Sequence, residues 1–323
     1  MSTHLYLIGN GFDLHHNINS SYLAFRGWMY DNNPDVMNDV ENIYGYCDKN
    51  WWSDFENQLA SLDAIRFGEE IAFENQPDLM SEHCDRTWND AEIEVEQKLE
   101  ALYSDIRVCF HDWIMQLNRP DAVKMVKIDT NDSIFINFNY TKTLEDLYGI
   151  SPSKILHIHG CIDCDEDFIL GHCKSYEELA KTNSVTLSEP PENITSEELE
   201  QFYEDEANKG QELHEQLATD AAIRGVASQQ KPVAKLMKKY SSFFESIKDV
   251  DHVHVYGLSL SEVDLPYLEY FASKFKDSHW EFNDYKGNDV AKINNFCRLN
   301  SLDHYSIISL EDIQYVRQLR LDF

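Results

Sequence analysis

A glycine-rich turn follows the first apolar segment of the chain, and its residue types suit nucleotide binding. The segment Leu5–Ile8 runs directly into Gly9, Asn10, Gly11, Phe12 and Asp13. Two glycines at this spacing after a strand let the backbone approach a ligand, and a following helix offers N–H groups to a phosphate. The full dinucleotide fingerprint needs a third glycine where Leu14 stands, so a plain strand-to-helix turn is the alternative interpretation.

Asp13 places a carboxylate in this turn, where it would repel a phosphate. It could cap the first turn of the helix, accept a hydrogen bond from a ribose hydroxyl, or bind a metal ion. We expect the backbone of the turn to approach a nucleotide, and Asp13 to face the ribose or to cap the helix. The candidate binding residues therefore begin with Gly9, Asn10, Gly11, Phe12 and Asp13.

Polar side chains also end two apolar segments in the middle of the chain. Ser133–Asn137 leads to Asn139 and Tyr140, and Lys154–His159 ends beside a glycine. Side chains at the carboxyl ends of parallel strands face the ligand crevice. Asn139 could hold a ribose hydroxyl there or orient a water, with Tyr140 beside it, and His159 could act as a general base. The alternatives are a helix cap for Asn139 and a structural imidazole for His159.

A second glycine turn lies near the C-terminus. The apolar segment His252–Tyr256 ends at Gly257, and Ser259 and Asp264 precede an amphipathic stretch. Ser259 could donate to a phosphate or cap the next helix, and Asp264 could cap it or contact a polar ligand. The nucleophile elbow of serine hydrolases needs a glycine where Ser261 stands, so we do not expect that chemistry.

Histidines, cysteines and carboxylates allow metal binding as an alternative. A structural zinc site could use Cys161, Cys164, His172 and Cys173, although the spacing is irregular and reduced thiols are the default. A catalytic metal could instead be bound by ligands drawn from Asp13, His15, His16, His157, His159, His172 and Asp264. A divalent cation would explain a carboxylate in a phosphate-binding turn.

Short strands in three clusters must position these residues. The expected strands are Leu5–Ile8, Ser133–Asn137, Lys154–His159, Phe168–Leu170, His252–Tyr256, His279–Asn283 and His304–Ile308. Several lack polar alternation, as strands of a helix-covered parallel sheet do. Helical stretches are expected over 51–66, 84–118 and 193–248, where Thr195 and Glu198 form a possible capping box and Lys231-Pro232 starts an apolar helix.

The pattern predicts one discontinuous α/β domain with a Rossmann-like, mostly parallel sheet flanked by helices. Core strands lie within about 3–18, 130–175 and 250–323, and large helical insertions occupy about 19–128 and 176–248. The Pro190-Pro191 pair marks a loop before the acidic part of the second insertion.

Composition and charge limit the classes of partner that the chain is expected to bind. The chain of 323 residues has 58 acidic and 27 basic side chains, a formal net charge of -31. Such a surface repels nucleic acids and anionic membranes at long range. We also expect no secretory signal, no membrane span and reduced cysteines, and therefore a cytoplasmic protein.

Taken together, the motifs resemble the bacteriophage abortive infection AbiH family. The blocks that carry the resemblance are spread from residue 5 to about residue 285 and read LYLIGNGFDLHH, WWSDFENQL, NFNYTKTLEDLYG, HIHG, LGH and GLSLSEVDLPYL. The resemblance implies a role in bacterial antiphage defence, commonly by arresting or killing the infected cell.

The order of the motifs is also similar to that of SIR2-like (SIR2/DHS-like) NAD-binding proteins. That resemblance implies NAD as substrate or ligand, cradled by Gly9–Gly11, with Ser259 at the phosphates. It implies that Asn139 orients the attacking water or holds the ribose, and that His159 is the base. The zinc ribbon of true sirtuins is missing from the sequence, which argues against protein deacylation.

Three functions follow for comparison. The first is a defence effector that hydrolyses NAD at the nicotinamide–ribose bond. The second is a metal-dependent hydrolase or nuclease, for which no firm metal ligand set emerges. The third is a non-enzymatic sensor of a nucleotide or a phage protein, with the acidic segment near 193–218 as its interaction surface. Expected partners are a small-molecule nucleotide, a phage-encoded trigger and a second copy of the chain, but not a membrane or nucleic acid.

Overall fold

The chain folds into two compact units. The computed structural model describes residues 3–76, 89–163, 167–183 and 213–315. The first unit comprises Met1–Trp28, Cys109–Leu170 and Lys231–Phe323, and the second comprises Met29–Val108 and Gly171–Gln230. Every described strand belongs to the first unit, whereas the named elements of the second unit are helices. The insertions expected from the sequence, 19–128 and 176–248, supply most of the second unit.

A six-stranded, all-parallel sheet forms the centre of the first unit, which confirms the predicted α/β class. Its strands are β1 (Thr3–Ile8), β2 (Ser133–Asn137), β3 (Ile155–His157), β4 (Val250–Tyr256), β5 (His279–Asn283) and β6 (Tyr305–Ile308). The spatial order is β3-β2-β1-β4-β5-β6. This is the order of doubly wound dinucleotide-binding folds, in which the chain reverses direction across the sheet between β1 and β4. Ligands of such folds bind outside the carboxyl ends of these strands.

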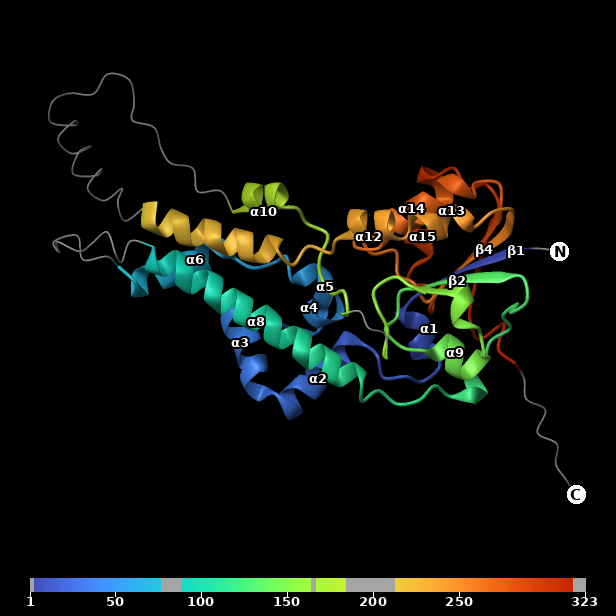
Figure 1. Ribbon diagram of the computed structural model, residues 1–323, viewed down its shortest axis with the longest axis horizontal. Helices are drawn as coiled ribbons and strands as arrows, with labels where there is room; N and C mark the ends of the chain where they lie inside the picture. The colour runs from blue at the N-terminus through green and yellow to red at the C-terminus, as the bar shows by residue number, and fades with distance from the viewer. Residues whose placement is uncertain (1–2, 77–88, 164–166, 184–212, 316–323) are drawn as a thin grey trace, which may run out of the picture. The chain divides into compact units, whose positions relative to one another are not determined.

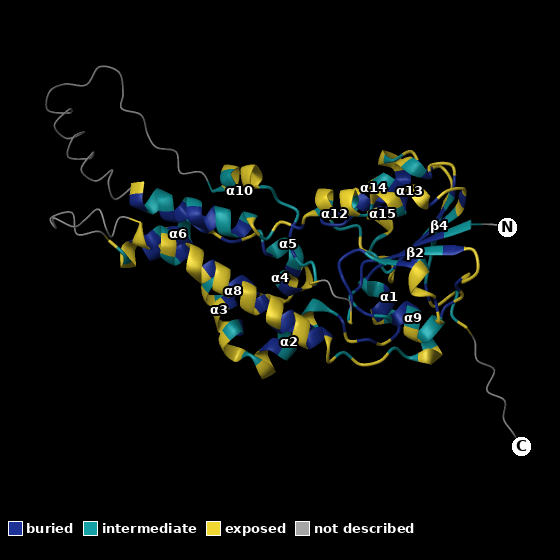
Figure 2. Cartoon of the chain, viewed as in Figure 1, coloured by how far each residue is buried: buried dark blue, intermediate teal, exposed yellow. Residues whose placement is uncertain are grey.

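Alternating side chains of the strands bury both faces of the sheet. Leu5 and Leu7 of β1 pack into one core, and Tyr6 and Ile8 pack into the other. The buried residues of both cores are at most 9% exposed, and Figure 2 shows β4 largely in the colour of buried residues. Continuous apolar strands of this kind require helices on each face.

Helices cover the two faces of the sheet, as Figure 1 shows for the labelled elements. One face packs against α13 (Ser241–Ser246), α14 (Leu265–Lys274) and α15 (Val290–Leu299), preceded by α12 (Val233–Lys239). The other face packs against α1 (Asn10–His15) and α9 (Thr143–Tyr148). Both short helices start at the carboxyl end of the preceding strand, β1 for α1 and β2 for α9, as the sequence motifs require.

The second unit is helical. Its elements are α3 (Pro34–Tyr44), α4 (Lys49–Ser53), α5 (Phe55–Gln58), α6 (Ala64–Glu74), α10 (Tyr176–Thr182), a helix over 213–227, and parts of α2 (Tyr22–Asn32) and α8 (Asp90–Ile114). The backbones of α6 and the 213–227 helix approach closely, because a Cβ added at Gly68 would lie 2.6 Å from the amide nitrogen of Thr219. None of the described helices has the length and apolar character needed to cross a membrane.

Local structure corrects three expectations. Phe168–Leu170 is not a strand, because the Ile169 N–H donates to the carbonyl of His159 and its own carbonyl accepts from the Tyr140 hydroxyl. The 51–66 stretch is divided among α4, α5 and α6, and the Asp63 side chain caps α6 by accepting from the N–H of Arg66. Pro232 occupies the N-cap of α12, one position before the helix. The proposed capping box at Thr195 and most of the acidic segment lie outside the described residues.

Candidate functional site

Two glycine turns meet at the carboxyl ends of β1 and β4. A Cβ added at Gly9 would lie 2.5 Å from the Cα of Leu258, and one at Gly11 would lie 2.8 Å from the Cα of Gly257. Gly257 itself has a φ of +66°, and its added Cβ would lie 2.0 Å from the amide nitrogen of Phe12. Side chains at these positions are therefore excluded by backbone, and glycine is required for direct contact between the turns.

Backbone hydrogen bonds fasten the first turn to the second. The Gly9 N–H donates to the carbonyl of Tyr256 over 3.0 Å, and the Gly11 N–H donates to the carbonyl of Gly257 over 2.7 Å. The Phe12 N–H donates back to Gly9, and the Asn10 side chain bonds Ser20. These groups thus bind other parts of the protein, and their contact with a nucleotide remains a prediction.

Asp13 is buried in a cluster of hydroxyl groups. Its carboxylate accepts hydrogen bonds from the hydroxyls of Thr141, over 2.5 Å, and Thr143, over 2.7 Å. Burial raises the pKa of Asp13 from its ordinary 3.8 to about 6, while the bonds from Thr141, Thr143 and the Asn139 side chain act in the opposite direction. Asp13 thereby ties α1 to the start of α9.

Asn139 links the end of β2 to the first glycine turn. Its side-chain amide donates to the carbonyl of Gly9 over 3.0 Å, and its own N–H donates to the side chain of Asn137. Tyr140, the next residue, donates its hydroxyl to the carbonyl of Ile169 and packs its ring 5.0 Å from that of Phe110. The structure therefore brings Asn139 beside Gly9 as the sequence motifs suggest, whereas Tyr140 faces the neighbouring loop.

His159 lies after β3 with its side chain enclosed. The residue is 1% exposed, and its ring stands 5.5 Å from that of Phe138 and 6.0 Å from that of Tyr267. Burial holds the pKa of His159 well below its ordinary 6.5, the positive charge of Lys231 lowers it further, and a hydrogen bond to the backbone of Phe138 opposes both. The imidazole is therefore neutral at pH 7.

Asp264 and Lys231 complete a buried cluster around His159. The Nε2 atom of His159 lies 3.8 Å from Oδ1 of Asp264, and Nζ of Lys231 lies 3.5 Å from the same oxygen. Both distances exceed those of ordinary hydrogen bonds. Within the described part of the chain, neither Nε2 of His159 nor Oδ1 of Asp264 has a hydrogen-bond partner. Asp264 occupies the N-cap of α14, but its side chain makes no capping bond and faces this cluster instead.

The tautomer of His159 follows from these contacts. Because Nε2 lacks a partner among the described residues, the backbone bond to Phe138 falls to Nδ1, which must donate to reach a carbonyl. The neutral ring then carries its lone pair on Nε2, facing Asp264. An unprotonated nitrogen at the carboxyl end of a parallel strand can accept a proton from water or a hydroxyl group.

The structure adds one residue that sequence reasoning missed and leaves another at the surface. Lys231 was expected only as the start of a helix, yet its side chain is 1% exposed beside Asp264. A single lysine before a proline carries no signal of this role. Ser259, a predicted phosphate contact, is exposed on the loop between β4 and α14. The role of Ser259 remains a prediction.

Most of the proposed metal ligands are engaged in other bonds. His16 bonds the carbonyl of Phe12 and the hydroxyl of Tyr148, and His157 bonds the carboxylate of Glu145 over 2.8 Å. His172 bonds the carbonyl of Val226. No group of three or more histidines, cysteines and carboxylates suited to a metal ion occurs among the residues that the structure describes.

One described cysteine differs from the expectation of reduced thiols. Cys161 is disulfide-bonded rather than reduced, whereas Cys47, Cys109, Cys173 and Cys297 are free thiols. Cys164, the second cysteine of the C-x-x-C motif, lies outside the described residues. The thiolate of Cys161 that a zinc site would need is therefore absent in this state.

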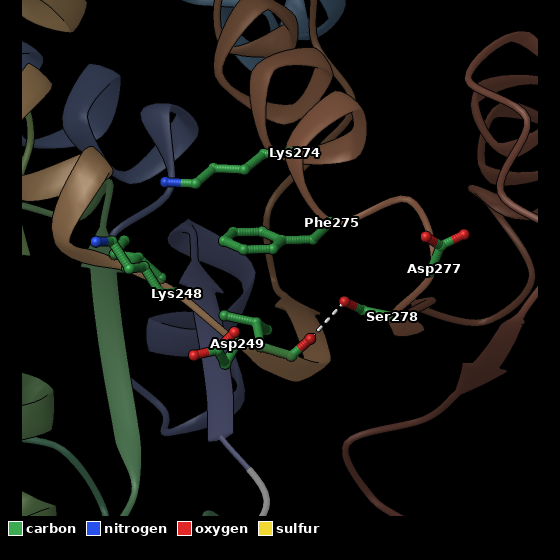
Figure 3. Close-up of a pocket in the computed structure, with 8 residues that line it drawn as sticks. Lys248, Asp249, Lys274, Phe275, Asp277 and Ser278 are labelled. Carbon is green, nitrogen blue, oxygen red and sulfur yellow. Dashed lines mark hydrogen bonds between the residues drawn. The ribbon is translucent and has the colours of Figure 1, made fainter.

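A cavity of about 380 Å³ lies at the amino ends of the strands, opposite the carboxyl ends where the glycine turns meet (Figure 3). It is lined by Ile247, Lys248, Asp249, Val250, Lys274, Phe275, Asp277 and Ser278. These residues surround the amino ends of β4 and β5, and the Ser278 hydroxyl donates to the carbonyl of Val250. Ligand sites of doubly wound sheets lie at carboxyl ends, so this cavity is separate from the cluster around His159.

Comparison with known proteins gives one family. The family described as "Bacteriophage abortive infection AbiH" matches residues 5–284, which include both glycine turns, Asn139, His159 and Asp264. Neither the curated proteins nor the solved structures contain a match to this chain.

Proposed function

Because this chain belongs to the bacteriophage abortive infection AbiH family, we propose that it acts as an antiphage effector by hydrolysing NAD at the nicotinamide–ribose bond. Family membership implies the role in abortive infection. The NAD chemistry is our proposal, and it is motivated by the SIR2-like order of the motifs and by the doubly wound sheet that holds them.

The buried His159, whose Nε2 has no hydrogen-bond partner among the described residues, is the observation on which the proposal depends. Its unpartnered Nε2 is the group that hydrolysis needs to accept a proton at neutral pH. In the proposed reaction, water attacks C1′ of the nicotinamide ribose, and the bond to nicotinamide breaks with its electron pair leaving on the ring nitrogen. The proton of the water passes to Nε2, and the transition state resembles an oxocarbenium ion.

We assign Asn139, which follows β2, to the same proposed site. The hydrogen bond from its side-chain amide to the Gly9 carbonyl places it at the first glycine turn, beside the switch point between β1 and β4. From there it would hold the ribose or orient the water. Asn139 therefore has two roles, since the same amide also stabilises the turn.

NAD turnover by purified protein tests the proposal. We expect nicotinamide release by wild type, release slower by roughly a hundredfold or more by His159→Ala, and slower release by Asn139→Ala. His157→Ala is the matched control, because it removes a mostly buried imidazole of the same segment, which bonds Glu145 instead. Melting temperatures must accompany Asn139→Ala, since loss of its bond to Gly9 alone costs about 1 kcal/mol.

Infected cells provide a second test of NAD hydrolysis. NAD should fall after infection in cells with wild type and stay level with His159→Ala, and protection should be lost with the variant. If cells with wild type are protected while their NAD stays level, NAD hydrolysis is wrong. Nucleotide binding without turnover would then favour a sensor, and cleavage that requires added metal would favour a metal-dependent hydrolase.

A further inference from the structure

The cluster of His159, Asp264 and Lys231 has a charge arrangement that the proposed base does not by itself require. Lys231 is a lysine with a 1% exposed side chain, in a position where an unpaired ammonium would be costly. Its Nζ lies 3.5 Å from Oδ1 of Asp264, and that oxygen is the one opposite Nε2 of His159. Sequence position does not predict the grouping, since the three residues follow β3, precede α12 and precede α14.

The two facing atoms are both hydrogen-bond acceptors. Nε2 of the neutral His159 carries a lone pair, and Oδ1 of Asp264 is a carboxylate oxygen. Acceptors do not bond one another, and a separation of 3.8 Å allows one oxygen atom to lie about 2.8 Å from each. A water molecule is the small species whose two O–H groups satisfy two acceptors at once.

We propose that Lys231 is a positioning residue, which anchors Asp264 opposite His159 so that the two acceptors together hold the attacking water. The inference rests on the proposed hydrolysis of NAD for the fate of that water, but not for the geometry. Asp264 then fixes one O–H of the water, and the other O–H points to Nε2 for deprotonation. Oxygen is left with a lone pair free for attack on C1′.

The positive charge of Lys231 has a second effect on the same group. A cation near the ring disfavours the imidazolium, so it preserves the lone pair on Nε2 in the presence of the Asp264 carboxylate. Among the described residues, the charged groups that face His159 are Lys231 from the segment before α12 and Asp264 from the start of α14, while Tyr267 of α14 and Phe138 after β2 supply rings. Removal of Lys231 would leave His159 beside an unpaired carboxylate.

Nitrogen NMR of the full chain tests this inference without any ligand. In protein with ¹⁵N-labelled histidines, the His159 signal is assigned by its absence from His159→Gln, because the chain has 13 histidines. Wild type should show an unprotonated Nε2 at pH 7. Lys231→Met should raise the pKa of His159, and Lys231→Arg should return this pKa most of the way to its wild-type value.

Lys235→Met is the matched control, because Lys235 is an exposed lysine of α12 only four residues away. Its His159 titration should equal that of wild type. The inference is overturned if Lys231→Met leaves the titration unchanged, or if wild-type Nε2 is protonated at pH 7. If Lys231→Met does not fold, Lys231→Gln and the wild-type tautomer decide the question.

Turnover separates this inference from the proposed function. With NAD as the probe, Lys231→Met should move the acid limb of the pH–rate profile upward by the same interval as the NMR titration. If NAD is not hydrolysed by wild type but the NMR shift occurs, the proposed function fails and the positioning role stands. If wild type hydrolyses NAD and the acid limbs of the wild-type and Lys231→Met profiles coincide, the positioning role fails and the function stands.

Discussion

Gly11 donates its backbone N–H to the carbonyl of Gly257 over 2.7 Å, so the turns after β1 and β4 are joined without any side chain between them. In many doubly wound folds the corresponding glycines leave room for a pyrophosphate. Here the same residue type serves a contact between two backbone segments. The glycines therefore explain the geometry of the switch point before any ligand is considered.

Gly257→Ala should destabilise the protein strongly. The added methyl group would meet the amide nitrogen of Phe12 at 2.0 Å, and the φ of +66° disfavours any residue with a Cβ. We expect the free energy of unfolding to fall by roughly 3 kcal/mol or more. Denaturant titration measures this loss.

Gly27→Ala is the control for that experiment. Gly27 lies within α2, is exposed, and has nothing within 4 Å of an added Cβ. Alanine should be neutral there or stabilise by up to about 1 kcal/mol. Equal effects of the two substitutions would contradict the contact between the turns.

The pH dependence of stability should reveal the buried carboxylate of Asp13. Its pKa of about 6 exceeds the ordinary 3.8, so the folded protein binds more protons than the unfolded chain between about pH 4 and 6. The contribution of Asp13 to the free energy of unfolding is therefore present below this window and lost as the pH rises through it. Asp13→Asn removes the effect. Its free energy of unfolding should therefore gain about 3 kcal/mol relative to that of wild type between pH 4 and 7.

Comparison of the two proteins isolates Asp13 from groups that titrate in the opposite direction. The pKa of His16 is lowered to about 4, mainly by burial, so its contribution rises as the pH increases from about 4 to 6.5. His16 is present in both wild type and Asp13→Asn, and its effect cancels in the difference. A difference that is constant with pH would show that Asp13 titrates normally.

Thr143→Val tests the hydroxyl cluster directly. The substitution keeps the shape of the side chain but removes the donor that lies 2.7 Å from Oδ1 of Asp13. We expect the free energy of unfolding to fall by about 1 to 3 kcal/mol at pH 7.5. It should fall by less at pH 5, where Asp13 is protonated in the folded protein. In a double-mutant cycle with Asp13→Asn the two costs should not add, whereas additive costs would indicate independent residues.

The rate of NAD hydrolysis should be nearly independent of pH between 6.5 and 8. Burial and Lys231 hold the pKa of His159 well below 6.5, so the base stays unprotonated across this range. Steady-state rates in buffers of constant ionic strength measure the profile. An acid limb centred near 6.5 would mean that the group responsible is a solvated histidine and not His159.

The sheet could be predicted from the sequence because its strands are short apolar runs that end in turn residues. Ser133–Asn137 and His279–Asn283 were predicted with the bounds that the structure shows. Phe168–Leu170 has the same apolar character, but its backbone bonds go to His159 and Tyr140, which local sequence does not reveal. The helical stretch 51–66 was similarly divided by capping at Asp63.

The candidate site was predictable only in part. Asn139 and His159 were identified because each follows an apolar strand, and position at a strand end is a local signal. The contact between Gly11 and Gly257 joins residues 246 positions apart by sequence number, and no pattern in one chain encodes it. The role of Lys231 could not be predicted for the same reason, because tertiary packing brings it beside its partner Asp264.

The two outer strands of the sheet have a consequence for self-association. β3 spans three residues and β6 spans four, so each border of the sheet exposes only a few backbone groups to a neighbouring molecule. Strand addition between copies would therefore gain little hydrogen bonding, and such short borders are a known defence against fibre growth. Within the part of the chain that the structure describes, helical and loop surfaces are therefore the ones that could stabilise an assembly of this protein at high local concentration.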